Sequence, residues 1–206
     1  MLAVLFKKRY TTFLAAFAMV ALLALPSHAQ DRAAEIQAML EGRDAQIKTM
    51  LQGEGDFTDA QREQLRDLVN NVIDFEAMGQ QALGRHWADL TEAQRTEFVE
   101  VFSEIVRSQS LADLDPYRAA VTYENIDVEG DAAHVVTSTV YKENPITVEY
   151  KLGFRNDQWM VDDIILDEVS TAEGYARSFQ SVVRKRGFET LMKSLRKKRD
   201  QVVSGA

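Results

Sequence analysis

The sequence predicts an α+β domain in which several helices cradle a twisted, four-stranded antiparallel sheet around an apolar cavity. Before residue 116, apolar side chains recur every three or four positions, which is the spacing of helices with one buried face. Over residues 119–166, apolar and polar side chains instead alternate in short runs separated by turn residues. Helical spacing then returns. Because a half-apolar sheet must bury one face, we expect the flanking helices to cover it.

Helices account for the chain before the sheet. The first is expected over residues 33–51, which carry a loose apolar stripe. Thr58 and Thr91 each precede a glutamine by three positions, the spacing of a capping box, so each is expected to open a helix. Residues 74–87 predict a short amphipathic helix that ends at Gly84, where a left-handed cap fits.

Four short runs make up the predicted sheet, and two helices follow it. The third run shows the alternation best, because Ile146, Val148 and Tyr150 are separated by polar residues. Short separators at 129–131, 144–145 and 155–157 predict an antiparallel meander. The runs are residues 119–128, 133–141, 146–154 and 158–166, and the helices that follow are residues 172–186 and 188–199.

The N-terminal segment has the organisation of a secretory signal peptide. Lys7, Lys8 and Arg9 precede an unbroken apolar run over residues 13–25, and the small-residue pattern Ser-His-Ala follows at 27–29. An apolar run of this length is short for a helix that spans a bilayer. We therefore expect a signal peptide over residues 1–29 and one exported domain over residues 30–206.

Composition argues against several function classes. The chain has no cysteine and a formal net charge of −8, so thiol catalysis and broad nucleic-acid binding are not expected. His86 and His134 have no close histidine neighbour, and the common nucleophile, zinc and nucleotide motifs are missing. We therefore expect no metal and no cofactor. Basic residues concentrate at 184–199, which indicates either a surface that docks onto anionic headgroups or an acidic partner, or a solvated helix face.

One enzymatic alternative depends on two adjacent carboxylates. Asp162 and Asp163 lie on the fourth predicted strand, so alternation turns one of them toward the apolar side, where burial raises the pKa of a carboxyl group. His134 is a further candidate acid or base. A bulge or a strand end is the simpler explanation, because a lone carboxylate without a positioned partner makes a weak site.

Several motifs occur in a fixed order along the chain. Residues 74–87 read D-F-E-A-M-G-Q-Q-A-L-G-R-H-W. Later segments are T-E-A-Q-R-T-E-F-V-E-V-F from Thr91, W-M-V-D-D-I-I-L-D-E-V-S from Trp159, Tyr175 with Phe179, and R-G-F-E-T-L-M-K-S-L from Arg186. Together they resemble the MlaC family of periplasmic phospholipid-binding proteins, also called toluene-tolerance proteins. The family's tyrosine and phenylalanine match Tyr175 and Phe179, whereas its arginine is displaced by one position to Arg177.

The resemblance implies a periplasmic shuttle that carries phospholipid between an outer-membrane lipoprotein–porin complex and an inner-membrane ABC transporter complex with an MlaD-like subunit. Such a carrier maintains the lipid asymmetry of the outer membrane. It implies no enzyme activity, no cofactor other than lipid as cargo, and a cone that resembles nuclear-transport-factor-like folds. A carrier of hopanoid or another polar lipid, a small exported acid–base enzyme, and a ligandless interaction module remain as alternatives.

The family resemblance implies that apolar residues from both halves of the chain line the lipid cavity, although for any one of them ordinary core packing is the default interpretation. The candidate lipid-binding residues are Phe75, Met78, Trp87, Phe98, Phe102, Val106, Val136, Val140, Val148, Tyr150, Leu152, Trp159, Ile164, Tyr175 and Phe179. The candidate residues for docking onto a partner are Arg184, Lys185, Lys197, Lys198 and Arg199.

Overall fold

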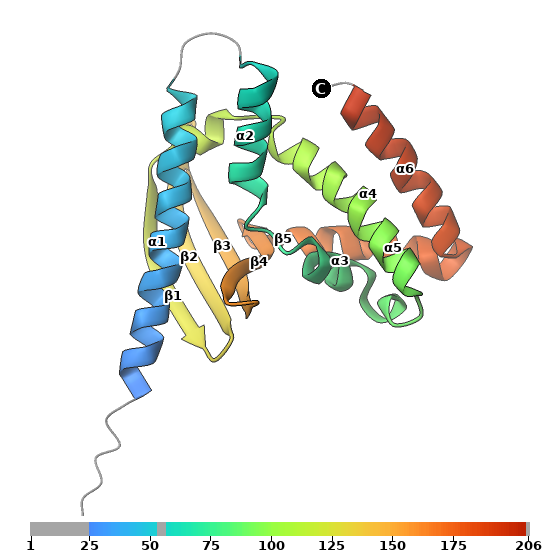
Figure 1. The fold of residues 1–206 in the computed structure, drawn as a ribbon, viewed down its shortest axis with the longest axis horizontal. Coiled ribbons are helices and arrows are strands. Elements are labelled where there is room, and N and C mark those ends of the chain that lie inside the picture. Colours follow the sequence, from blue (N-terminus) through green and yellow to red (C-terminus); the bar gives the residue numbers. More distant parts are fainter. Residues whose placement is uncertain (1–24, 53–56, 205–206) are drawn as a thin grey trace, which may run out of the picture.

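The structure is a computed structural model that describes residues 25–52 and 57–204. Most of the predicted signal peptide lies outside these residues, and its cleavage stays a prediction. The elements follow the predicted order of helices, sheet and further helices (Figure 1). Within the described ranges, no helix has the length and apolar character needed to cross a membrane.

The helices before the sheet begin where their caps predict. Both capping boxes are confirmed, because the Thr58 and Thr91 hydroxyls accept hydrogen bonds from the backbone three residues on, and the glutamines there return the bond. Gly84, with a φ of 55°, ends the third helix as predicted. The helices are α1 (Leu25–Leu51), α2 (Asp59–Asn70), α3 (Phe75–Leu83) and α4 (Glu92–Ser110), with 3-10 turns η1 (Gly84–Trp87) and η2 (Asp115–Arg118).

An antiparallel meander of five strands follows within the described residues, in the spatial order β1-β2-β3-β4-β5. The prediction of four strands was therefore wrong by one, because the two residues of β5 are too few to show alternation. The strands are β1 (Val121–Glu129), β2 (Ala132–Tyr141), β3 (Asn144–Arg155), β4 (Gln158–Leu166) and β5 (Val169–Ser170). Helices α5 (Thr171–Arg186) and α6 (Phe188–Ser204) complete the fold.

The turn between β2 and β3 lies two residues earlier than predicted. Lys142 and Glu143 form it, with φ values of 49° and 66°. Asn144 and Pro145 already belong to β3, and Pro145 pairs with Val140. The sequence pointed to Asn144 and Pro145 because asparagine and proline are strong turn residues, yet proline is also tolerated at the beginning of a strand.

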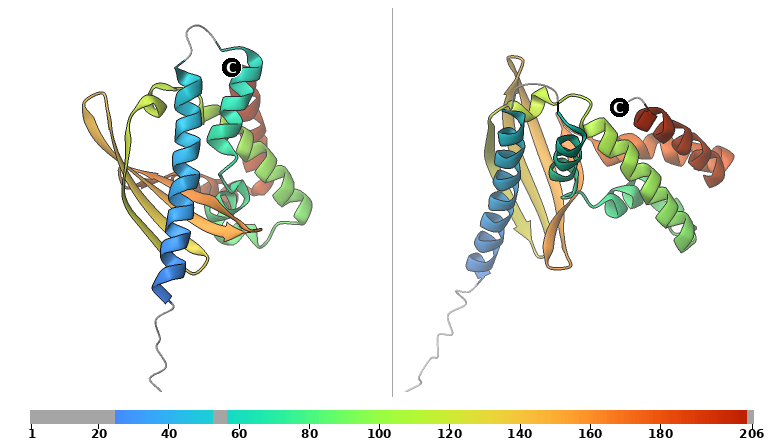
Figure 2. Two further views of the ribbon diagram at one scale, coloured as in Figure 1. Left: turned by 60° about the vertical axis from the view of Figure 1, so that its left-hand side comes forward. Right: turned by 45° about the horizontal axis from the view of Figure 1, so that its top comes forward.

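The pairing register divides the sheet into two faces. Tyr123, Thr137 and Val148 are successive cross-strand partners, so they share one face. Helix α1 lies across this face, mainly over β1, and α2 packs beside α1 (Figures 1 and 2). We call this the inward face. The opposite, outward face carries His134 and Glu149, whose ring Nε2 and carboxylate Oε2 are 2.7 Å apart.

The other helices form a tightly packed block, which we call the helical block. Helix α3 packs against α5, and α4 packs against α6. Phe98 and Phe102 are fully buried and stack with ring centroids 5.5 Å apart, and Phe179 meets both edge-on. A Cβ atom on Gly79 would come within 2.9 Å of the Phe98 ring, so close packing requires glycine in this part of α3.

Polar contacts join the sheet to the helices. Asp163 is buried on β4, where its carboxylate accepts hydrogen bonds from the Ser170 hydroxyl (2.6 Å) and the Ala172 backbone N–H (3.0 Å). These donors lie at the start of α5, so the carboxylate also satisfies the free N–H groups of a helix terminus. Near the N-terminal end of α1, the Arg32 guanidinium stacks 4.4 Å from the centre of the Phe154 ring.

Candidate functional site

The inward face of the sheet is apolar but incompletely covered. Several of its side chains remain only half-buried: Val121, Tyr123, Ile126, Val128, Val148, Tyr150, Phe154 and Ile164. In the helical block, by contrast, Met78, Leu83 and Phe98 are 0% exposed. Because protein interiors normally pack to a uniform high density, these half-buried side chains leave apolar surface available on the inward face.

Eight of the fifteen predicted lining residues belong to the helical block. They contact mainly one another, for example through the Phe102–Tyr175 ring pair at 5.0 Å. The Tyr175 hydroxyl donates to Gln109 Oε1 at 2.6 Å. The residues of this group are Phe75, Met78, Trp87, Phe98, Phe102, Val106, Tyr175 and Phe179. Their packing is that of an ordinary core, and their contact with lipid stays a prediction.

The predicted lining residues of the sheet separate onto its two faces. Val148, Tyr150, Leu152, Trp159 and Ile164 lie on the inward face. Val136 and Val140 lie on the outward face, because side chains at odd and even positions of β2 point in opposite directions. Val140 is 63% exposed. The structure therefore does not bring these two valines together with the other lining residues.

Tyrosines give the inward face a polar component. Burial raises the pKa of Tyr117 and of Tyr150 to about 12, and it raises the pKa of Tyr123 as well. The Asp44 carboxylate of α1, which pairs with Lys48 at 2.7 Å, adds to the rise in pKa at Tyr123 and Tyr150. All three hydroxyls therefore remain protonated at neutral pH and can donate hydrogen bonds.

The candidate acid–base residues are engaged in structural contacts. The predicted bulge is confirmed, since Asp162 is the extra residue at a register shift in the β3–β4 pairing. Asp162 accepts two hydrogen bonds from Arg155, at 2.7 and 2.8 Å, while Asp163 caps α5. His134 pairs with Glu149 on the outward face. In the described parts of the chain, no group of three or more His, Cys, Asp or Glu residues is placed to hold a metal ion.

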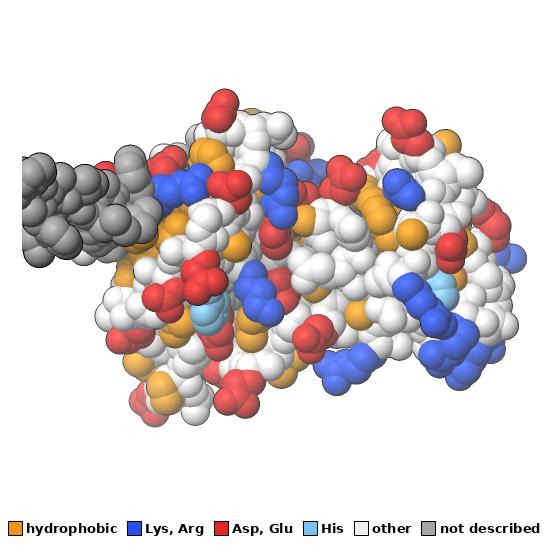
Figure 3. All heavy atoms as spheres, turned by 90° about the horizontal axis from the view of Figure 1, so that it is seen from below, with side chains coloured by type: hydrophobic (Ala, Val, Ile, Leu, Met, Phe, Trp, Pro, Cys, Tyr) orange, Lys and Arg blue, Asp and Glu red, His pale blue; other side chains and the backbone are white. Residues whose placement is uncertain are grey.

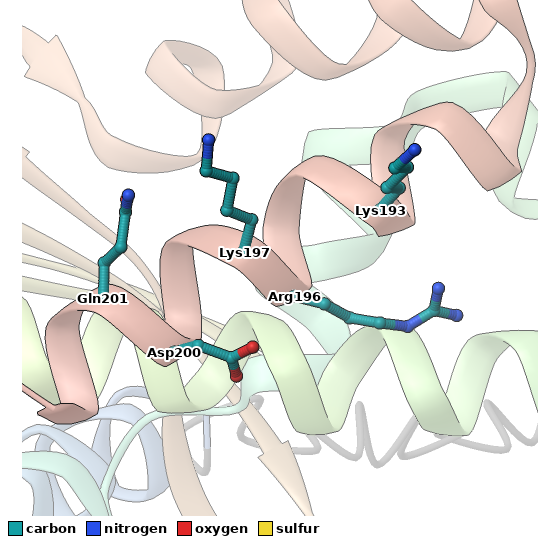
Figure 4. Close-up of a pocket in the computed structure, with 5 residues that line it drawn as sticks. All are labelled: Lys193, Arg196, Lys197, Asp200 and Gln201. Atoms are coloured by element: carbon teal, nitrogen blue, oxygen red, sulfur yellow. The ribbon is translucent and has the colours of Figure 1, made fainter.

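Two shallow hollows lie on the C-terminal helices and open widely to solvent. The hollow on α6 is lined by Lys193, Arg196, Lys197, Asp200 and Gln201 (Figure 4). The hollow on α5 is lined by Glu173, Ala176, Arg177, Gln180, Ser181 and Arg184. Both linings are mainly polar or charged side chains, so neither hollow is the predicted apolar cavity. The displaced Arg177 is exposed there, away from the inward face.

Charge is distributed unevenly between the two ends of the molecule. Helices α5 and α6 carry nine basic and three acidic residues, whereas residues 121–170 carry three basic and eleven acidic residues. Figure 3 shows basic side chains gathered at the lower right of the face in view. Of the predicted docking residues, Arg184, Lys185, Lys197 and Lys198 are exposed. Arg199 instead contacts Glu104 at 3.6 Å and Asp200 at 2.8 Å.

Sequence reasoning missed the contribution of β1 to the inward face. Val121 and Tyr123 alternate in one frame, and Ile126 and Val128 alternate in the other. A register shift between Tyr123 and Asn125 changes the frame, so both pairs reach the same face. The sequence does show these two short alternating pairs, but no single two-residue period places all four side chains on one face of the strand.

Comparisons with known proteins complement this geometry. The family described as "MlaC protein" matches residues 33–197 of the chain. A solved structure from Ralstonia solanacearum, described as a phospholipid-binding protein in complex with a phospholipid, superposes with a TM-score of 0.67 at 21% identity, covering 82% of this chain and 97% of that chain. At this identity, the likeness shows a shared fold. No curated protein matches the chain.

Proposed function

Because this chain belongs to the MlaC family, we propose that it binds a phospholipid by its acyl chains and carries it through the periplasm. Its partners are an outer-membrane lipoprotein–porin complex and an inner-membrane ABC transporter complex. The observation that carries this proposal is the half-buried apolar surface of the inward face. The phospholipid described with the Ralstonia solanacearum protein supports the same class of cargo, since the two chains share a fold.

The energetics of such a carrier require neither catalysis nor a cofactor. Removing an acyl chain of about 16 carbons from water is worth on the order of 13 kcal/mol, at about 0.8 kcal/mol per methylene. Free lipid in water is therefore negligible. A bilayer offers nearly the same stabilisation, so loading and unloading are close to balanced overall. Docking onto a membrane-bound partner then lowers the barrier to extraction.

To test the proposal, the mature chain (residues 30–206) is purified from a bacterial periplasm and its intact mass is measured by native mass spectrometry. We expect a stoichiometric mass excess, which lipid mass spectrometry of the denatured sample resolves into diacyl phospholipids. A hopanoid or another polar lipid in that sample would identify a different cargo for the same carrier. A bare polypeptide mass that persists after incubation with liposomes would contradict the carrier function.

A charge on the inward face should abolish lipid retention. Val148 is half-buried there, so Val148→Glu introduces a carboxylate into the acyl-chain region, and its desolvation opposes binding. Val140→Glu is the matched control, since Val140 is exposed on the outward face. We expect only Val148→Glu to lose co-purified lipid, with circular dichroism unchanged in both. Lipid at wild-type stoichiometry in Val148→Glu would show that the inward face is not the binding surface.

The basic surface of the C-terminal helices is the proposed docking surface of this carrier. Its position supports this role, because α5 and α6 lie at the end of the molecule remote from β1 (Figure 1). Lys197 and Lys198 extend into solvent from α6, whereas Arg199 is held by its contacts with Glu104 and Asp200. Exposed lysines are therefore the residues that meet a partner, and Arg199 has a structural role as well.

A further inference from the structure

A band of hydroxyl groups crosses the inward face. Tyr123 on β1 pairs directly with Thr137 on β2, and Tyr150 on β3 lies one diagonal step from Thr137. Tyr123 and Tyr150 pack against the larger cluster of buried apolar residues, which joins Val135, Leu152 and Val161 of the sheet to the helical block. A separate, smaller cluster is centred on Ile47, Leu51 and Leu65. The band of Tyr123, Thr137 and Tyr150, which we call the tyrosine band, is thus a polar strip within an otherwise apolar surface.

The tyrosine band offers donors that the protein itself does not use fully. A tyrosine hydroxyl in apolar surroundings normally finds a partner, as Tyr117 does with the Ser110 carbonyl at 3.0 Å. In the part of the chain that the structure describes, the Tyr123 hydroxyl has no such partner. The Thr137 hydroxyl donates to the Val148 carbonyl at 2.8 Å, so its proton is not available to Tyr150. The Tyr150 hydroxyl lies within hydrogen-bonding reach of Thr137 and is therefore the donor in that pair, which it exchanges for the lipid in the proposal below.

The surroundings of the tyrosine band match the chemistry of one part of a diacyl lipid. Acyl chains are apolar, headgroups are charged, and ester carbonyls, which accept hydrogen bonds, lie between them. Apolar side chains of the larger cluster pack against the band, and the Asp44 carboxylate of α1 is close enough to raise the pKa of both tyrosines. Asp44 pairs with Lys48, and the two side chains are 34% and 25% exposed. The apolar surface matches the acyl chains, the neutral hydroxyl donors match the ester carbonyls, and the partly exposed ion pair matches the charged headgroup.

We propose that the Tyr123 and Tyr150 hydroxyls donate hydrogen bonds to the ester carbonyls of the bound lipid, and so fix the depth at which the acyl chains lie on the inward face. This inference rests on the proposed function and adds a recognition element to it. The cargo is then distinguished by its acyl-ester linkage, in addition to its apolar bulk. The raised pKa values of both tyrosines support this role, because they keep the donors protonated.

An ester phospholipid and its ether-linked analogue, with the same headgroup and chain length, test the inference. The ether lipid lacks the carbonyl acceptors but keeps the apolar surface. We expect wild-type protein to bind the ester lipid more tightly. Tyr123→Phe and Tyr150→Phe should each weaken ester-lipid binding by between about twofold and tenfold and leave ether-lipid binding unchanged. Tyr141→Phe is the control, because that hydroxyl contacts Asp113 near the β2–β3 turn.

Three results would overturn the inference. Wild-type protein that binds both lipids equally shows that the carbonyls are not recognised, and this measurement needs no variant. Phenylalanine variants that bind the ester lipid as tightly as wild type exclude the hydroxyls as donors. Equal losses for both lipids indicate a change in the shape of the inward face. Wild-type protein that binds neither lipid contradicts the proposed function itself, so the two failures are distinguishable.

Discussion

Asp163 shows how one residue can look catalytic in sequence and be structural in the fold. Its carboxylate is 1% exposed and accepts hydrogen bonds from Ser170 and Ala172 at the start of α5. Negative charge is favoured at a helix N-terminus, and buried donors there require acceptors. The adjacent Asp162 takes the extra position of the bulge and pairs with Arg155 at the surface. Neighbouring carboxylates thus have unrelated roles.

Asp163→Asn should lower the free energy of unfolding by about 2 kcal/mol, because the amide places a donor against one of the two buried donors. Urea unfolding followed by circular dichroism measures the loss. Asp162→Asn is the matched control and should cost about 1 kcal/mol or less, since its ion pair with Arg155 is partly solvated. Equal losses of unfolding free energy in the two variants would show that Asp163 does not stabilise the contact between β4 and α5.

Alkaline pH should destabilise the protein through its half-buried tyrosines. The pKa of Tyr117 and Tyr150 rises from 10.0 to about 12 in the folded state, so between these pH values the folded protein binds more protons than the unfolded chain. The contribution of these two tyrosines to the free energy of unfolding is therefore fully present below pH about 10 and is lost as the pH rises toward about 12. Thermal unfolding across this range should show a shallower pH dependence in Tyr150→Phe than in wild type. Parallel curves would contradict this.

At the scale of elements, the turn between β2 and β3 holds two residues in a conformation that favours glycine. Lys142 and Glu143 have φ values of 49° and 66°, typical of a type I′ turn, for which Asn-Gly is the preferred sequence. Replacing the pair by Asn-Gly should stabilise the protein by about 1 kcal/mol in urea unfolding.

Gly130→Ala is the converse test, in the turn between β1 and β2. Gly130 has a φ of +59° and no atom crowds the site, so backbone strain alone should destabilise the variant in urea unfolding.

The same turn shows which parts of the fold local sequence determines. Helix starts were predictable because Thr58 and Thr91 cap their own helices with nearby residues. The β2–β3 turn was not predictable, because pairing along two whole strands imposes it on Lys142 and Glu143 against their preference. The two-residue β5 likewise depends on its pairing with β4.

The candidate site was predictable in composition but not in arrangement. Val148 and Phe98 each belong to a regular apolar pattern in the sequence, one alternating and one helical, yet Val148 is half-buried on the inward face and Phe98 is 0% exposed in the helical block. Core and lining residues differ only in what lies opposite them, which tertiary packing decides. Val140 fell on the outward face because strand parity is fixed by register, and Tyr123 was missed because of a bulge.

At the scale of the whole molecule, the basic C-terminal helices should speed lipid exchange with negatively charged membranes. Lys197→Glu with Lys198→Glu should slow lipid uptake from anionic vesicles at low salt, with little effect on neutral vesicles. The control is Lys142→Glu with Lys151→Glu, which changes the net charge equally but lies in the β2–β3 turn and on β3, within the acidic part of the chain. Lipid content after long incubation should be unchanged in both. Equal slowing would show that only net charge matters.

The unequal packing of the two halves also determines which backbone amides exchange with solvent. Amides of α4, in the helical block, should exchange only through global unfolding. Helix α1 lies over the half-buried inward face, and β1 forms one edge of that face. Amides of these two elements should exchange through local opening at a smaller free energy. Cargo on the inward face would add contacts to these segments alone and raise their protection toward that of α4. A bound lipid would then serve as a removable portion of the hydrophobic core.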